Sequence, residues 1–189
     1  MINEFFPVFL NLRDKLCIVI GGGKVAERKV ENLIKVNAKV KIISPDLTPT
    51  LKKLAEEGKI DWERRVYKKG DLDSAWLVIA ATNDPNTQKE IYNEAEEKRI
   101  FCNIVDVPEL CSFIVPSIIR RGFLTIAIST FGISPAVARR IRETLEEIIG
   151  EEYILYLELM KNLRKQVLDL NLSTQEKEEK LQKLALAPI

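Results

Sequence analysis

The chain of 189 residues is long enough for one domain of ordinary size and a smaller addition. Its 29 Lys and Arg residues balance its 28 Asp and Glu residues, so no overall charge attracts nucleic acid or an acidic membrane surface. A hydrophobic share of 46% supports a buried core. The sequence shows no N-terminal signal and no apolar run of transmembrane length. We therefore expect a cytoplasmic protein with no nucleic-acid partner and no membrane partner.

Histidine and cysteine usage narrows the chemistry. The chain contains no histidine, which removes the commonest general base and the commonest metal ligand. Acid–base work must therefore fall to carboxylates, hydroxyls or lysines. The cysteines, Cys17, Cys102 and Cys111, show no C-x-x-C spacing, and their odd number argues against a disulfide framework. We expect buried free thiols and no fixed metal site.

The first predicted elements are an edge segment, a strand and a helix. Residues 1–10 are apolar around one proline and indicate an edge segment leading into a sheet; residues 16–20 predict a buried strand. The helix that follows has an apolar face of Ala26, Val30, Leu33 and Ile34. Its opposite face is predicted to hold Glu27, Arg28, Lys29, Glu31 and Lys35. We expect Asn37 to close it in the left-handed conformation.

Three glycines, Gly21, Gly22 and Gly23, separate that strand from that helix. Together with Ala26 they match G-x-G-x-x-A, in which the first glycine makes a tight turn and the second lets the backbone approach a pyrophosphate. The phosphates would bind the N–H groups at the helix N-terminus, helped by its dipole. The alternative is a plain glycine-rich turn. The strand before it and the helix after it favour nucleotide binding.

The second predicted strand, residues 39–44, ends in Ser44, Pro45 and Asp46. An acidic residue about 20 positions beyond the glycines binds the ribose hydroxyls in dinucleotide folds, so Asp46 is the candidate. A free acid there disfavours a 2′-phosphate, and we therefore expect NAD rather than NADP. The alternative is that Asp46 is only a turn or cap residue.

The next segments continue the alternation of strands and helices. We expect a helix over 48–57 stopped by Gly58, strands over 62–67, 76–81 and 101–105, and a helix from Pro85 to about 98 capped by Asp84. The fold class is therefore α/β, a right-handed, doubly wound parallel sheet of Rossmann type. Ligands bind beyond the carboxyl ends of such strands. The cofactor cleft is therefore predicted to include Ala81, Thr82, Asn83 and Val105.

The pattern changes after residue 112. Strand-like runs over 113–119 and 124–129 indicate a hairpin, and Ser134 with Pro135 opens a helix that ends at Gly150. Residues 151–189 are predicted to be helical, with a break at 171–172 and a capping box of Ser173 and Glu176. We expect a Rossmann domain over 1–112, a hairpin-plus-helix dimerisation region over 113–150 and a helical domain over 151–189. So small a unit must bury its apolar faces against a second copy or the nucleotide domain, and we expect a homodimer.

Five motifs in this order resemble the precorrin-2 dehydrogenase and sirohydrochlorin ferrochelatase family, the unit that also forms the N-terminal part of siroheme synthase. They are residues 19–29, 80–84, 103–108, 112–117 and 134–139. The resemblance covers about residues 5–150. It implies an NAD domain, a dimerisation region and a small helical domain, and an enzyme that uses NAD to oxidise precorrin-2 to sirohydrochlorin. Many members also insert iron. The chain ends without the methyltransferase domain of fused siroheme synthases, so we expect another protein to methylate.

Asp106 is the predicted catalytic residue. The expected strand over 101–105 delivers it to the cofactor edge, and the functional aspartate of the family falls on it. Oxidation of a reduced tetrapyrrole releases a hydride and a proton, so a carboxylate near the nicotinamide is needed. The alternative is a turn residue before Pro108. In metal insertion the same carboxylate would accept a pyrrole proton, and ferrous iron would be a substrate rather than a bound cofactor.

The resemblance also implies which residues bind cofactor and substrate. The cofactor set is Gly21, Gly22, Gly23, Lys24, Val25, Ala26, Ser44, Pro45, Asp46, Ala81, Thr82, Asn83 and Val105. The substrate set is Ser112, Thr130, Gly132, Ser134 and Arg139. The substrate carries several carboxylates, which Arg120, Arg121, Arg139, Arg140 and Arg142 would meet in bidentate fashion. The alternative for each of these arginines is a solvated helix face that also carries Glu143, Glu146 and Glu147.

Two other classes of protein share parts of these patterns. An NAD-sensing binding module would need the glycine turn and Asp46 but has no use for Asp106 or the helix at Ser134. A short-chain dehydrogenase is excluded, because no tyrosine is followed four residues later by lysine. Within the resembling family, dehydrogenase alone and dehydrogenase with chelatase stay open, since one aspartate would serve both reactions.

Overall fold

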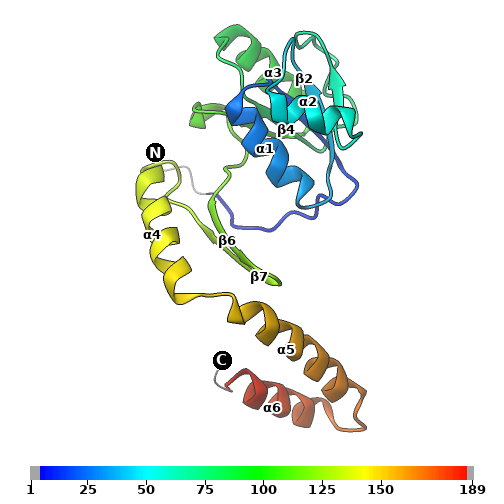
Figure 1. Cartoon of the computed structure of the whole chain (residues 1–189), viewed down its shortest axis with the longest axis vertical. Coiled ribbons are helices and arrows are strands. Elements are labelled where there is room, and N and C mark those ends of the chain that lie inside the picture. Colours follow the sequence, from blue (N-terminus) through cyan, green and yellow to red (C-terminus); the bar gives the residue numbers. More distant parts are fainter. Residues whose placement is uncertain (1–4, 187–189) are drawn as a thin grey trace. The chain divides into compact units, whose positions relative to one another are not determined.

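The computed structural model describes residues 5–186 and divides into two compact units, one up to Ile114 and one from Val115 onward (Figure 1). The predicted division into 1–112, 113–150 and 151–189 is finer and stays a prediction.

The first unit is built on a parallel sheet of five strands in the order β3-β2-β1-β4-β5. The strands are β1 Leu16–Ile20, β2 Lys39–Ile43, β3 Asp61–Glu63, β4 Leu77–Ala80 and β5 Phe101–Ile104. The helices are α1 Lys24–Ile34, α2 Pro49–Glu56 and α3 Pro85–Lys98, followed by a 3-10 turn at Pro108–Leu110. This arrangement confirms the predicted doubly wound α/β class.

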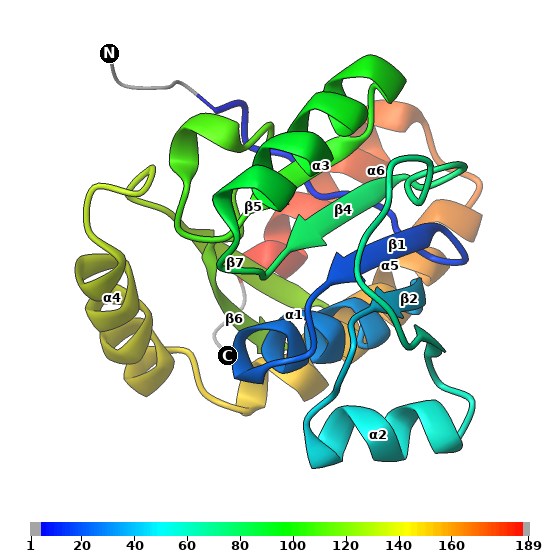
Figure 2. The same cartoon turned by 90° about the horizontal axis from the view of Figure 1, so that it is seen from above.

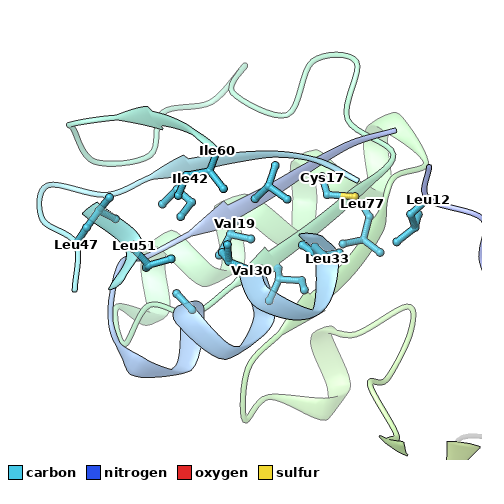
Figure 3. Packing of buried hydrophobic residues seen from close by; sticks show 13 residues of the cluster. Leu12, Cys17, Val19, Val30, Leu33, Ile42, Leu47, Leu51, Ile60 and Leu77 are labelled. Atoms are coloured by element: carbon cyan, nitrogen blue, oxygen red, sulfur yellow. The ribbon is translucent and has the colours of Figure 1, made fainter. Parts of the chain in front are cut away.

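Helices cover both faces of this sheet, which is why its strands are apolar on both sides. In Figure 2, α1 and α2 lie on one side and α3 on the other. On the first side, Val30 of α1 and Leu51 of α2 pack against Val19 and Ile42 (Figure 3). On the second side, Ile91 of α3 belongs to a separate buried cluster that is formed with β4 and β5.

Two predictions about the first unit are wrong. Residues 6–10 are exposed and form no strand, because Pro7 donates no ladder hydrogen bond and the apolar side chains, Phe6 and Phe9 among them, find no face to cover. The part of this prediction on residues 1–4 lies outside the described residues. The third strand ends at Glu63 rather than at Tyr67.

The chain leaves β3 because side chains hold the next segment in a loop. Arg65 pairs with Glu63 and with Asp71, and the backbone N–H of Lys68 donates to Asp71. Tyr67 then turns inward and donates its hydroxyl to the buried carboxylate of Glu94. The loop therefore satisfies its polar groups without a strand partner.

Glu94 organises this loop. Its side chain is fully buried on α3 and accepts hydrogen bonds from the N–H of Gly70 at 2.9 Å, the N–H of Leu72 at 3.1 Å and the ammonium of Lys98 at 2.7 Å. Burial alone would raise the pKa of this carboxyl, but Lys98, Tyr67 and the two N–H groups outweigh burial and lower the pKa below its ordinary value of 4.5. Glu94 is therefore a buried anion with its own set of donors.

The second unit contains an antiparallel hairpin and three helices. They are β6 Ser117–Arg121, β7 Leu124–Ile128, α4 Pro135–Ile148, α5 Glu152–Asp169 and α6 Thr174–Ala185. The side chain of Ser134 caps α4, and a capping box of Ser173 and Glu176 opens α6, as predicted. Among residues 115–186, the buried apolar side chains are Ile119, Ala138 and Val167.

The hairpin is shorter than predicted. Residues 113–116 precede β6, because the amide of Asn103 in β5 donates to the carbonyl of Phe113 at 3.0 Å and holds this segment against the first unit's own sheet. The connection is the two residues Gly122 and Phe123, with Gly122 at φ +56°.

None of the helices described between residues 5 and 186 is long and apolar enough to cross a bilayer. Cys17 and Cys102 are buried free thiols, as expected, whereas Cys111 is half-buried.

Candidate functional site

The first two glycines of the turn are required by close backbone approach. Gly21 lies at φ +109°, and a Cβ there would stand 2.3 Å from the carbonyl oxygen of Ala81. A Cβ on Gly22 would stand 2.0 Å from the carbonyl oxygen of Asp46. The two glycines therefore let the loops after β1, β2 and β4 meet, a reason for Gly22 that the motif alone does not supply.

Gly23 has a different role, because a Cβ on it would meet no protein atom within 4 Å. It is also the N-cap of α1, and no side chain in residues 5–186 caps this helix; the first intrahelical bond runs from Glu27 N–H to the Gly23 carbonyl at 3.0 Å. The N–H groups of Lys24, Val25 and Ala26 are thus left for an outside acceptor. Open space beside Gly23 together with uncapped N–H groups fits a pyrophosphate.

The strand ends form one edge. The N–H of Gly21 donates to Ile43 at 3.0 Å, the N–H of Ala81 to Ile20 at 2.7 Å and the N–H of Val105 to Ala80 at 2.9 Å. These bonds continue the pairing of β2, β1, β4 and β5 by one residue beyond each strand. The residues predicted to line the cofactor cleft therefore come from four loops at the carboxyl edge of one sheet.

Asp46 lies just past β2 with its side chain 73% exposed. The ammonium of Lys52 stands 2.8 Å from its Oδ1, and the Ser44 hydroxyl donates to its backbone carbonyl at 2.7 Å. Lys52 is the main cause that holds the pKa of the Asp46 carboxyl below its ordinary value. Arg64 also contributes to this shift, and its Nε donates to the carbonyl of Pro45 at 3.4 Å. Asp46 is thus ionised and accessible.

The loop after β4 holds Thr82 and Asn83. Thr82 is tied to α3, since the amide of Gln88 donates to its carbonyl at 2.6 Å. Asp84 accepts from the N–H of Thr87 at 3.0 Å and caps α3, as predicted. Asn83 is exposed, and its side chain makes no hydrogen bond with residues 5–186, so its amide is free to bind a ligand.

Asp106 follows β5 and is exposed, with a left-handed backbone at φ +63°. Asparagine and aspartate are the non-glycine residues that tolerate this conformation best. Cys111 holds this loop to β5, because its thiol donates to the carbonyl of Ile104 at 3.2 Å and lies 3.3 Å from that of Val107. The carboxylate of Asp106 makes no hydrogen bond or ion pair with the described residues.

Lys29 is a neighbour of this site that sequence reasoning missed. It was predicted to face solvent, but it is half-buried on α1 with Asp106 and Cys111 near its ammonium. Burial and the nearby Arg28 lower the pKa of Lys29, and the charges of Asp106 and Cys111 oppose this. Glu27 is likewise turned inward and accepts from the Thr48 hydroxyl. The helical spacing could have indicated this position, because Lys29 lies three residues after the buried Ala26 and such residues share a helix face.

The hydroxyl of Ser112, a predicted substrate ligand, is already hydrogen-bonded within the first unit. Its hydroxyl oxygen accepts from the N–H of Cys102 at 2.8 Å and so joins the loop to β5.

The other predicted substrate ligands lie in the second unit, before or on α4. Thr130 and Ser134 are hydrogen-bonded: the Thr130 hydroxyl donates to the Ser134 carbonyl at 2.9 Å and accepts from the Ser134 N–H at 3.1 Å. Gly132, at φ +83°, completes this turn. The Arg139 guanidinium pairs with Glu143 at 2.8 Å. These hydrogen bonds close a turn directly before α4, and the side chain of Ser134 caps the helix.

The arginines predicted to bind substrate carboxylates differ in whether they form ion pairs within the chain. Arg142 lies 3.2 Å from Glu143 and also pairs with Glu146, and Arg121 lies 3.5 Å from Glu151. No ion pair of the described residues involves Arg120 or Arg140. Residues 5–186 also contain no group of three or more acidic or cysteine side chains placed to hold a metal ion.

Comparison with known proteins gives the family. Residues 8–117 match the family model described as putative NAD(P)-binding, and residues 121–148 match the model described as the sirohaem biosynthesis protein central region. The siroheme synthase of Methylobacillus flagellatus is 45% identical over 150 residues, which are 79% of this chain and 32% of that protein. Siroheme synthase 1 of Aeromonas hydrophila is 40% identical over 164 residues, which are 87% of this chain and 35% of that protein.

The chain thus spans about a third of the length of the curated relatives it matches. Among solved structures it is similar to SirC, precorrin-2 dehydrogenase, with a TM-score of 0.83 and 26% identity over 95% of this chain and 89% of that one. The chain carries an NAD(P)-binding domain and belongs to the precorrin-2 dehydrogenase and sirohydrochlorin ferrochelatase family, as its motifs predicted.

Proposed function

We propose that this chain is an NAD-dependent dehydrogenase that oxidises precorrin-2 to sirohydrochlorin. The observation that carries the proposal is the sheet edge on which the open, uncapped turn at Gly23 and the unpaired carboxylate of Asp106 both lie. The similarity to a precorrin-2 dehydrogenase over nearly the whole chain supports it. The comparisons give no support to an NAD-sensing module.

In this proposal the N–H groups of Lys24, Val25 and Ala26 hold the pyrophosphate and Asp46 binds the adenosine ribose. NAD supplies the hydride acceptor when bound. The unpaired carboxylate of Asp106 takes the proton that leaves with the hydride, and precorrin-2 and NAD⁺ become sirohydrochlorin, NADH and H⁺. Lys29 is a cationic neighbour of this carboxylate, and the charge of Asp106 acts to raise the pKa of Lys29.

Asp46 supports NAD rather than NADP as the cofactor. Its carboxylate is ionised and exposed at the end of β2, where it would accept hydrogen bonds from both ribose hydroxyls. A 2′-phosphate would meet a negative charge there.

We further propose that the second unit binds the acidic tetrapyrrole and that ferrous iron is a second substrate. Arg120 and Arg140, unpaired among the described residues, are the guanidinium groups most available to substrate carboxylates, with Arg139 after release from Glu143. Iron insertion requires that pyrrole nitrogens lose protons, and Asp106 would accept them as well. The enzyme would then act as oxidoreductase and as a lyase of the ferrochelatase type.

A homodimer is proposed because the second unit leaves large apolar side chains exposed on the hairpin, on α4 and in the loop between them. They are Phe123, Phe131, Ile133, Val137, Ile141 and Ile148. An exposed apolar patch of this kind marks an interface. Light scattering at micromolar concentration should give twice the chain mass, and a monomer would contradict the proposal. The cytoplasmic location stays a prediction.

The test is anaerobic incubation of the pure chain with precorrin-2 and NAD, followed by absorbance of NADH and sirohydrochlorin and then by addition of ferrous iron. Asp106→Asn keeps a residue that tolerates φ +63° but removes the base, so NADH formation should fall about 10²–10⁴-fold while NAD affinity stays unchanged. Glu109→Gln, an exposed carboxylate in the same loop, is the control and should keep wild-type turnover. Normal turnover in Asp106→Asn would exclude the proposed role.

A further inference from the structure

Two cations border the carboxylate of Asp46, and they come from different elements. Lys52 lies on α2 and pairs with Asp46 at 2.8 Å. Arg64 directly follows β3 and donates to the carbonyl of Pro45 at 3.4 Å. Asp46, which would bind a ribose hydroxyl, therefore has two positive charges beside it. Binding of a hydroxyl group does not require these charges.

The side chain of Arg64 is held in place but not neutralised. Its guanidinium carbon lies 5.8 Å from the ring centre of Trp62, and Trp62 in turn donates its indole N–H to the Ser44 carbonyl at 2.9 Å. No ion pair among residues 5–186 involves Arg64. The backbone carbonyls of Ser44 and Pro45, in the loop that carries Asp46, thus position Trp62 and Arg64. The guanidinium of Arg64 is held there without an ion-pair partner among the described residues.

Space for a ligand group exists beside these cations. Lys52, Trp62 and Arg64 line an open groove of about 600 Å³ between α2 and β3. Acidic Glu56 and Asp61 line the same groove, but neither forms an ion pair with Lys52 or Arg64 among the described residues. A group that enters this groove therefore meets Arg64, which forms no ion pair with the described residues, and Lys52, whose present partner is Asp46.

We propose that Lys52 and Arg64 form a binding subsite for the 2′-phosphate of NADP, which the carboxylate of Asp46 now occupies through its ion pair with Lys52. This inference rests on the proposed function, because it needs the adenosine ribose at Asp46. In dinucleotide folds an acid at this place excludes the 2′-phosphate, whereas a nearby arginine accepts it. This chain contains both, so the choice between the two cofactors depends on one side chain.

The test is binding of NADH and NADPH to the whole chain, followed by cofactor fluorescence without substrate. Asp46→Ser removes the charge and keeps a hydroxyl for the ribose. NADPH affinity should rise at least tenfold relative to wild type, and NADH affinity should fall severalfold. Lys52→Ala or Arg64→Ala in the Asp46→Ser background should each remove most of the gain. Lys53→Ala, which deletes an exposed lysine on the same helix that is paired with Glu57 at 3.9 Å, is the matched control and should keep it.

The outcomes separate this inference from the proposed function. A wild-type chain that binds NADH, with an Asp46→Ser variant that gains no affinity for NADPH, would overturn the subsite alone. A gain that survives loss of both cations would do the same. Binding of neither nucleotide by the wild-type chain would overturn the proposed function together with the subsite.

Discussion

The glycine turn allows folding and cofactor binding to be tested apart, because two of its glycines are needed for different reasons. Gly21→Ala places a methyl group 2.3 Å from the backbone oxygen of Ala81 at φ +109°. Gly23→Ala places a methyl group where no protein atom lies within 4 Å, in an extended conformation that alanine adopts freely. The two substitutions add the same atom two residues apart.

The magnitudes differ accordingly. In Gly21→Ala the positive φ costs about 1–2 kcal/mol and the overlap about 1–3 kcal/mol, so the free energy of unfolding should fall by about 2–5 kcal/mol. In Gly23→Ala the poorer helix cap costs about 1 kcal/mol, and the lower entropy of the unfolded chain returns about 0.4–1 kcal/mol. Its stability should therefore stay within about 1 kcal/mol of wild type, while NAD affinity falls at least about tenfold, or about 1.4 kcal/mol.

Thermal unfolding of the apo chain and titration with NAD measure the two effects. At about 2–4 °C per kcal/mol, Gly21→Ala should lower the Tm by about 4–20 °C. Gly23→Ala should keep a Tm near wild type and lose NAD affinity, and Gly23→Asp should lose more because it adds a negative charge at the phosphates. NAD affinity in Gly23→Ala equal to that of wild type would refute the placement of the pyrophosphate.

Further predictions concern the buried anion and the thiols. Glu94→Ala leaves several buried donors without an acceptor, so the free energy of unfolding in denaturant should fall by about 3–5 kcal/mol. Glu97→Ala, which is exposed on the same helix, should lower it by less than about 0.5 kcal/mol. Equal losses in the two variants would contradict this assignment of Glu94. Because the folded pKa of Glu94 is lowered from 4.5, its stabilisation is present above this value and disappears as the pH falls through the folded pKa, so the advantage of wild type over Glu94→Gln should shrink in acid. A difference independent of pH would exclude this linkage. Burial raises the pKa of Cys17 to about 11 and of Cys102 to about 12, so neither thiol should react with iodoacetamide in the native chain near neutral pH, and mass spectrometry would detect any labelling that speaks against it.

Local signals in the sequence were sufficient for most elements of the fold. The glycine turn, the caps at Asp84 and Ser134, and the left-handed Asn37 were all predicted, and the structure contains each of them. These features depend on residues within a few positions of each other, so propensity and hydrogen bonding along the chain determine them. Patterning also predicted the parallel sheet, since only strands covered on both faces are apolar throughout.

Tertiary structure decided which charges meet. Lys29 lies near Asp106, and Asp46 pairs with Lys52 from the next helix, although the pattern on α1 predicted that Lys29 faces solvent. The short β3 was also decided this way, because a loop bound to Glu94 on α3 replaces the end of the predicted strand. The residues of each of these contacts come from different elements, and the order of strands across the sheet brings them together. The sequence by itself therefore determined the elements and the family motifs, whereas the electrostatic surroundings of Asp46 and Asp106 required the folded sheet, because charge interactions depend on distance in space and not on separation along the chain.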